Sequence, residues 1–220
     1  MSPSARASLN LLRMSVGVVD CGIANLGSIK KILGEIVTDV RVLTEPQELN
    51  QVDKVILPGV GSFPAAMKKM KSKGLEGALK SLAFEKQLPI LGICLGMQLL
   101  AEHGFEFGDT EGLALIPGSV TKLESTNSER RIPHVGWNSM NIIQQSPLFE
   151  GILDQTDFYF VHSFKYDLED NVHQLASTNH GTDFPSVIAR QNIYGVQFHP
   201  EKSSKAGHKL LTNFCGLEKC

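Results

Sequence analysis

The chain has 220 residues, a formal net charge of −2 and a hydrophobic fraction of 42%. This length suits one α/β domain with a sizeable core. The balanced charge argues against a dedicated nucleic-acid binder. No apolar run approaches the roughly 20 residues that a membrane-spanning helix needs. We therefore expect neither nucleic acid nor a membrane among its partners.

The four cysteines are sparse and include no C-x-x-C pair; they are Cys21, Cys94, Cys215 and Cys220. This spacing argues against a zinc site or a disulfide scaffold and favours a reduced, cytoplasmic protein without metal or cofactor. Residues 1–14 lack the apolar core and cleavage site of a signal peptide, so we expect a disordered extension there. We expect residues 15–220 to form one domain.

The first hundred residues alternate short apolar runs with segments of helical periodicity. We expect strands at 16–20, 40–43, 54–57 and 88–93, and helices at 25–36, 64–71, 75–86 and 97–103. This alternation is typical of an open, mostly parallel sheet with helices on both faces.

After residue 113 the patterns become those of strands separated by turn residues. We expect strands at 120–123, 140–143, 157–164, 173–177, 185–190 and 193–198, and a last helix at 205–214. The predicted fold is therefore α/β, an open mostly parallel sheet flanked by helices, with a β-rich second half.

The segment Gly92-Ile93-Cys94-Leu95-Gly96 carries the strongest chemical signal. It has the form of a nucleophile elbow with Cys in place of Ser, in which a sharp strand-to-helix turn pushes the side chain out of the sheet. The glycines remove Cβ atoms that would clash in that turn, and the helix N-terminus favours a thiolate. A buried structural cysteine is the competing interpretation, and the strand–turn–helix context favours the nucleophile.

A thiol nucleophile needs a proton shuttle and a group that orients it. His199-Pro200-Glu201 follows the last predicted strand, where residues i and i+2 face the same way. We therefore predict that His199 is the base and Glu201 its orienting carboxylate, against the alternative of an ordinary exposed turn. We expect His173, His180 and His208 to be solvated, because their surroundings are polar.

Attack on an amide also needs backbone donors for the developing oxyanion. One candidate is the N–H of Leu95, the residue after the nucleophile. The other is the loop 58–63, PGVGSF, whose Gly59 and Gly61 permit a close approach of backbone to ligand. An ordinary β–α turn would have the same composition, so this signal is weak by itself.

Taken in order, five motifs resemble the class I (triad) glutamine amidotransferases: PGVGSF at 58–63, GICLGMQLL at 92–100, PHVGWN at 133–138, FVHSF at 160–164 and GVQFHPEKS at 195–203. Within that class they look most like the glutaminase subunits of imidazole glycerol phosphate synthases. The resemblance runs from about residue 16 to residue 214. It implies a flavodoxin-like fold and release of ammonia from L-glutamine to a separate (β/α)₈ cyclase subunit in histidine biosynthesis.

The resemblance also implies roles for individual residues. Catalysis would fall to Cys94, His199 and Glu201. The oxyanion hole would be formed by Gly59, Val60, Gly61 and Leu95. Substrate contacts would come from Gln98, His162 and Ser163, the last two through their backbone. The interface with the cyclase would include Asn25, His134, Trp137, Asn138 and Lys202.

One departure from the family pattern follows the first strand, where the family usually has Asp-Tyr-Gly and this chain has Asp20-Cys21-Gly22. It leaves open a paralogous subunit that supplies ammonia to a surface-sugar amidotransferase. Two further alternatives are a γ-glutamyl hydrolase or cysteine peptidase on the same fold, and an inactive binding module. Gln98 and the His-Pro-Glu motif argue against the hydrolase, and the retained triad argues against the inactive module.

Overall fold

A computed structural model describes residues 14–22, 26–124 and 131–217. Its helices are α2 Leu26–Gly34, α3 Phe63–Ser72, α4 Leu75–Phe84, α5 Leu95–Gln98 and α6 Ser204–Gly216. Its strands are β1 Ser15–Val19, β2 Asp39–Leu43, β3 Lys54–Gly59, β4 Ile90–Cys94, β5 His103–Gly104, β6 Thr110–Glu111, β7 Gly118–Lys122, β8 His134–Ile142, β9 Thr156–His162, β10 Phe164–Leu168, β11 Gln174–Asn179, β12 Asp183–Arg190 and β13 Ile193–Val196.

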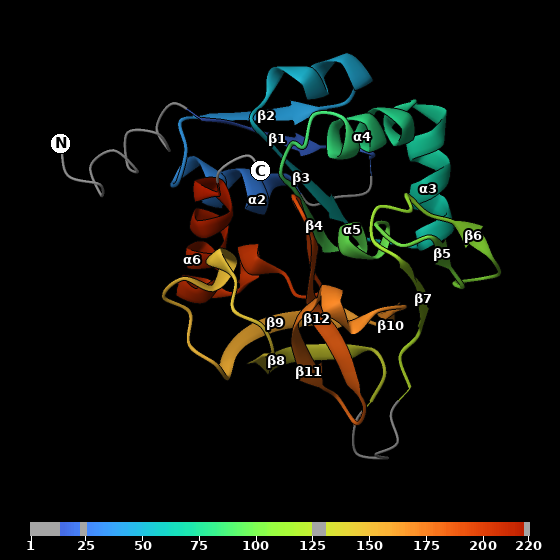
Figure 1. Cartoon of the computed structure of the whole chain (residues 1–220), viewed down its shortest axis with the longest axis vertical. Coiled ribbons are helices and arrows are strands. Elements are labelled where there is room, and N and C mark those ends of the chain that lie inside the picture. The colour runs from blue at the N-terminus through green and yellow to red at the C-terminus, as the bar shows by residue number, and fades with distance from the viewer. Residues whose placement is uncertain (1–13, 23–25, 125–130, 218–220) are drawn as a thin grey trace.

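Within the described residues, nine strands form one large sheet in the order β2-β1-β3-β4-β13-β12-β11-β8-β9. The pairings from β2 to β13 are parallel, and those from β13 to β9 are antiparallel. Figure 1 shows the parallel strands in the upper half of the molecule and β8, β9 and β11 below them. The predicted fold class, including its β-rich second half, is confirmed.

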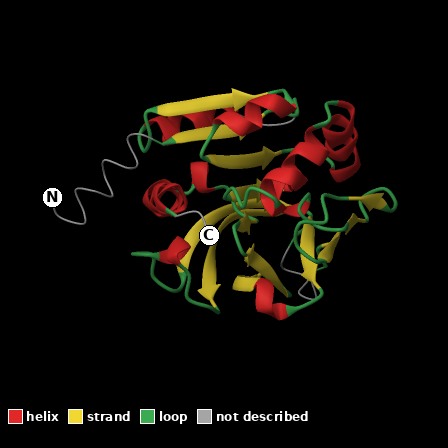
Figure 2. Cartoon of the chain, turned by 45° about the horizontal axis from the view of Figure 1, so that its top comes forward, coloured by secondary structure: helices red, strands yellow, loops and turns green. Residues whose placement is uncertain are grey.

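The parallel strands are buried on both faces, which explains why they read as continuous apolar runs. On β3, Val55 and Leu57 pack with α3 and α4, whereas Ile56 faces the opposite core. That second core includes Leu33 of α2 and Phe214 of α6. Figure 2 shows helices on both sides of the sheet, so each face is covered.

A second, four-stranded sheet in the order β10-β7-β5-β6 flanks the first among the described residues. The predicted strand 157–164 is in fact two strands, β9 in the large sheet and β10 in the small one. They separate at Ser163, whose carbonyl accepts a hydrogen bond from Leu123 N at 2.8 Å. The chain therefore changes sheets at this residue, beside the end of β4.

The predicted helix at 97–103 is wrong. The helix α5 begins at Leu95 and ends at Gln98, and His103 lies in β5. Carbonyls that would continue the helix instead accept hydrogen bonds from the loop after β6, as Leu99 does from Leu113 N and Leu100 from Leu115 N. Because α5 has only one turn, its dipole adds less to the stabilisation of a thiolate than a full helix would.

The prediction of a disordered extension at residues 1–14 falls almost entirely on residues that the structure does not describe. Residues 1–13 of the expected extension lie outside the described ranges, and β1 begins at Ser15, where the expected domain starts. No helix within the described residues is both long and apolar enough to cross a bilayer.

Candidate active site

Cys94 lies at the carboxyl end of β4, at the turn into α5. Its backbone has φ 54° and ψ −111°, a conformation that is strained for a residue with a side chain. The turn is tight, because a Cβ on Gly96 would lie 1.7 Å from the Leu57 carbonyl oxygen and one on Gly92 2.6 Å from that of Gly96. The elbow therefore depends on glycine at both positions.

His199 and Glu201 lie beyond the end of β13, the strand next to β4. The Nδ1 of His199 lies 2.8 Å from the Oε1 of Glu201, and both side chains are buried. The pair forms across a 3₁₀ turn, Pro200–Lys202, rather than along an extended strand as the sequence predicted. The backbone N–H of His199 donates to the Tyr159 carbonyl and ties the turn to β9.

The electrostatic surroundings of His199 favour its protonated form. Burial by itself lowers the pKa of the imidazole, but its interactions with the side chains of Cys94 and Glu201 outweigh burial and raise it to about 9. Such a histidine holds a proton at neutral pH, next to the Cys94 sulfur. Among the described residues its Nε2 is buried without a conventional hydrogen-bond partner, and so is the Oε2 of Glu201.

The Cys94 sulfur contacts the other half of the sheet as well. Its Sγ lies 3.7 Å from the Val161 carbonyl oxygen, and Gln197 Nε2 lies 3.8 Å from Sγ. The other described cysteines are less suited to nucleophilic chemistry, because burial raises the pKa of Cys21 to about 11 and that of Cys215 to about 12. Cys21 is buried, so the departure from the family pattern does not alter an exposed rim.

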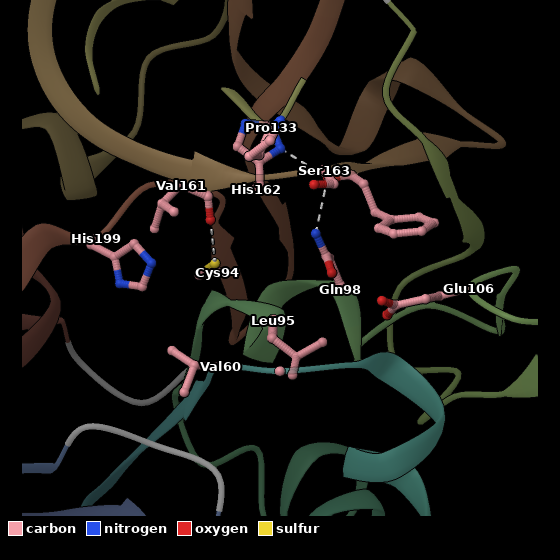
Figure 3. Close-up of a pocket in the computed structure, with 12 residues that line it drawn as sticks. Val60, Cys94, Leu95, Gln98, Glu106, Pro133, Val161, His162, Ser163 and His199 are labelled. Carbon is pink, nitrogen blue, oxygen red and sulfur yellow. Dashed lines mark hydrogen bonds between the residues drawn. The ribbon is translucent and has the colours of Figure 1, made fainter. Parts of the chain in front are cut away.

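A cavity of about 380 Å³ opens over the sulfur. It is lined by Val60, Gly61, Cys94, Leu95, Gln98, Glu106, Pro133, Val161, His162, Ser163, Phe164 and His199. In the view of Figure 3, Cys94 lies between His199 and Gln98, and Glu106 lies beyond Gln98. A cavity of this size accommodates an amino acid.

The predicted oxyanion residues lie around the elbow. Gly59 ends β3 and pairs with Cys94, and a Cβ there would lie 3.0 Å from that of Leu95. Gly61 has φ +109°, which favours glycine, and it lines the cavity together with Val60 and Leu95. Their role as donors to an oxyanion stays a prediction.

The predicted substrate residues reach the cavity in different ways. Gln98 is buried and donates from Nε2 to the Phe164 carbonyl at 3.0 Å and to Gln197 Oε1 at 3.1 Å. Both N–H groups of the Gln98 amide are therefore donated to protein acceptors, and its Oε1 is the atom left to bind a ligand. The His162 side chain bonds Phe164 O and His134, so only its backbone and that of Ser163 remain for glutamine.

Two residues of the site were missed by the sequence reasoning. Glu106 places a carboxylate in the cavity wall, where its Oε2 accepts from Phe63 N at 2.8 Å. It lies in a short loop between β5 and β6, where an acidic residue is ordinary, so no local pattern singles it out. Gln197 lies inside the GVQFHPEKS motif, but its link between Gln98 and Cys94 depends on distant partners.

The predicted interface residues do not all reach the surface. Trp137 is 53% exposed and meets Tyr159 edge to face, and the Nζ of the exposed Lys202 lies 5.8 Å from the Tyr159 ring centroid. Asn138 is partly buried. His134 is only 3% exposed and its ring is stacked on Phe160 and His180, so it does not lie on the exposed surface beside Trp137, and its role at the interface stays a prediction.

Two further predictions concerned the position of Asn25 at the interface and the exposure of His180. Asn25 lies outside the described residues. His180, expected to be solvated, is buried instead, because its ring stacks on His134 of β8 and its Nε2 bonds the Arg131 carbonyl. The described ranges hold no group of three or more His, Cys, Asp or Glu side chains placed to share a metal ion.

The family model "Glutamine amidotransferase class-I" matches residues 17–216. The chain belongs to the class I glutamine amidotransferases. A relative from Caldanaerobacter subterraneus, "Imidazole glycerol phosphate synthase subunit HisH", is 41% identical over 93% of this chain and 99% of its own. "Imidazole glycerol phosphate synthase subunit HisH 1" of Campylobacter jejuni is 43% identical over 92% of this chain and 100% of its own.

Solved structures share the fold at lower identity. PurLQS from Thermotoga maritima is 18% identical, with a TM-score of 0.70 over 92% of this chain and 98% of that chain. The glutaminase domain of Trypanosoma brucei CTPS, solved with bound acivicin, is 15% identical, with a TM-score of 0.63 over 92% and 93%. Both show the same arrangement of sheet and helices.

Proposed function

We propose that this chain is the glutaminase subunit of an imidazole glycerol phosphate synthase. It hydrolyses L-glutamine to glutamate and ammonia, and the ammonia passes to a separate (β/α)₈ cyclase subunit. The observation that carries the chemistry is the convergence of Cys94, His199 and Glu201 at the ends of the neighbouring strands β4 and β13, with Cys94 and His199 facing one cavity and Glu201 bonded to His199 behind them. The names of the relatives support the pathway.

In the proposed reaction the proton of the Cys94 thiol already rests on His199, and the deprotonated sulfur attacks the carboxamide carbon of glutamine. The tetrahedral intermediate collapses when His199 returns that proton to the leaving nitrogen, which departs as ammonia and leaves a thioester. His199 then accepts a proton from water, which attacks the thioester and releases glutamate with the thiolate restored. Glu201 holds the imidazole at Nδ1 throughout.

The cavity supplies groups for the rest of the substrate. The oxyanion formed at the carboxamide would accept hydrogen bonds from Leu95 N–H and from the 59–61 loop. The α-ammonium group of glutamine fits the Glu106 carboxylate and the free Oε1 of Gln98. The exposed surface formed by Trp137, Tyr159 and Lys202 is the proposed docking site for the cyclase.

The test compares the wild-type chain with Cys94→Ala, each alone and mixed with the cyclase subunit and its ribonucleotide ligand. Glutamate release should rise on addition of the cyclase for the wild type and fall at least ~10³-fold for the variant. Gel filtration should show the same complex for both proteins, which controls for folding. Undiminished hydrolysis by Cys94→Ala would exclude the mechanism. Wild-type activity that the cyclase does not stimulate would favour the surface-sugar amidotransferase.

A further inference from the structure

A row of hydrogen-bonded side chains runs from the partly buried Asn138 on β8 to the wall of the cavity. Asn138 Nδ2 lies 3.2 Å from His134 Nε2, His134 Nδ1 lies 2.9 Å from His162 Nε2, and His162 Nδ1 lies 2.9 Å from the Phe164 carbonyl oxygen. His134 and His162 are opposite each other in the β8–β9 register. The proposed mechanism does not use this row.

The proton positions near the cavity follow from the partners. The Phe164 carbonyl can only accept, so His162 Nδ1 carries a proton. Burial lowers the pKa of His162 to about 4, so its ring is neutral at pH 7 and its Nε2 carries a lone pair. The proton between the two rings therefore belongs to His134 Nδ1.

The proton positions at the far end follow in the same way. Asn138 Nδ2 donates to the Asn179 carbonyl at 2.9 Å, and its Oδ1 accepts from Ser139 N at 2.9 Å, which fixes the orientation of the amide. Nδ2 is thus a donor toward His134 as well, and His134 Nε2 accepts. Every hydrogen bond in the row points the same way, from Asn138 through His134 and His162 to Phe164 O.

The end of the row is part of the substrate cavity. Phe164 O also accepts the hydrogen bond of Gln98, and Gln98, Ser163 and Phe164 all line the cavity, as Figure 3 shows for the labelled Gln98 and Ser163. We propose that His134 and Asn138 are positioning residues for glutamine binding, because the row they begin holds His162 in one tautomer and thereby holds the Phe164 carbonyl that anchors Gln98. This proposal rests on the proposed function.

The physical reason lies in the cost of a misplaced proton. Without the donor at His134, the Nδ1-protonated tautomer of His162 loses its partner at Nε2. The other tautomer would turn a lone pair of Nδ1 toward the lone pairs of the Phe164 carbonyl. A buried acceptor that loses its donor costs more than the hydrogen bond itself contributed, so the wall would shift to restore pairing. The shift would reach Gln98 and the bound substrate.

The stack of rings offers a matched control. His180 lies 4.0 Å from His134 between ring centroids and is also buried, but its Nε2 bonds the Arg131 carbonyl and takes no part in the row. His134→Phe removes the donor to His162 while keeping a flat ring. His180→Phe removes a comparable hydrogen bond from the same stack. His134→Asn keeps a donor at the position of Nδ1 and should restore it.

The full chain, saturated with the cyclase and its ligand, is assayed for glutaminase activity. His134→Phe should raise KM for glutamine about 5- to 20-fold with kcat within about twofold, because the loss affects binding of substrate and transition state equally. His180→Phe should leave both within about twofold, and His134→Asn should recover part of the KM. The ¹⁵N shifts of His162 should report a protonated Nδ1 in the wild type and a tautomer mixture in His134→Phe.

An unchanged KM in His134→Phe, an equal rise in His180→Phe, or unchanged ¹⁵N shifts of His162 would overturn the proposal. A fall in kcat at constant KM would do so too, because it would indicate a disturbed triad rather than a disturbed binding wall. Failure of the proposed function has a different signature, namely no glutamine turnover by the wild type, and the ¹⁵N comparison would then still test the row.

Discussion

The two halves of the large sheet meet at the Cys94 cavity and fix their functional groups by different means. In the parallel half, the backbone sets the position of the sulfur, through a strained residue between two glycines that have no room for a Cβ. In the antiparallel half, side chains set the position of the cavity wall, through hydrogen bonds among the partly buried Asn138 and the buried His134 and His162.

This difference has consequences for what each half can tolerate. A site fixed by close packing of the backbone fails when a single carbon atom is added, and the failure does not depend on pH. A site fixed by imidazole hydrogen bonds tolerates small changes of shape but depends on protonation. The predictions below test these two expectations.

The largest effect is expected in the parallel half. In Gly96→Ala the new Cβ would lie 1.7 Å from the Leu57 carbonyl oxygen. This neighbour is backbone of strand β3 rather than the end of a flexible side chain, so it cannot move away easily. The free energy of unfolding, measured with urea, should fall by about 4 kcal/mol or more, or the protein should not fold. The control is Gly77→Ala in α4, where a Cβ meets nothing within 4 Å and should stabilise by up to about 1 kcal/mol. Similar results for both variants would contradict the argument.

A smaller effect is expected in the antiparallel half, and it depends on pH. Burial lowers the pKa of His162 from 6.5 to about 4. The hydrogen bond to the Phe164 carbonyl raises this pKa, whereas the nearby His180 and His199 lower it further, by smaller amounts than burial. Between these values the unfolded chain binds the proton and the folded chain does not. The stability contributed by neutral His162 is therefore present above pH 6.5 and is lost as the pH falls toward 4.

His162→Gln removes this titration, so its stability should fall less steeply with decreasing pH than that of the wild type. The slopes should differ by about 1.4 kcal/mol per pH unit between pH 6 and 5, the value for one proton. Urea unfolding at pH 7, 6 and 5 measures both slopes, and His162→Asn should behave in the same way. Parallel slopes for the wild type and the two variants would show that His162 titrates alike in both states.

The same comparison explains what the sequence could predict. The elbow, the parallel strands and the His-Pro-Glu turn are local patterns, since glycines flank one cysteine and a triad pair lies two residues apart. The strand order that places β13 beside β4 is not local and was not predicted, but the resemblance to the family implied that Cys94 and His199 act together. The groups fixed by the backbone are therefore predictable by residue number from the sequence.

The side-chain contacts of the antiparallel half were not predicted, because they join residues far apart in the sequence. Burial of His134 depends on Phe160 and His180, which no pattern near residue 134 reveals. Glu106 reaches the cavity only because its loop folds back to the start of α3 at Phe63. The prediction of a helix at 97–103 was wrong for the same reason. The carbonyls of Leu99 and Leu100 accept hydrogen bonds from backbone N–H groups of a loop some fifteen residues later.

The smallest expected effect isolates the strain at Cys94 itself. Both Cys94→Gly and Cys94→Ala remove the thiol, so their difference reports only the backbone. Glycine is usually the less stable of the two by roughly 1 kcal/mol, because it loses more conformational freedom on folding. At φ 54° and ψ −111° a Cβ is costly, by about 1–3 kcal/mol, so here the order should reverse and the glycine variant should be more stable by about 1 kcal/mol. Urea unfolding of the two inactive proteins measures this difference directly. An alanine variant that is the more stable by the usual margin would mean that the turn relaxes at no cost. The sulfur would then be positioned by its contacts with Val161 and Gln197, as groups in the antiparallel half are positioned by side-chain contacts, rather than by the backbone.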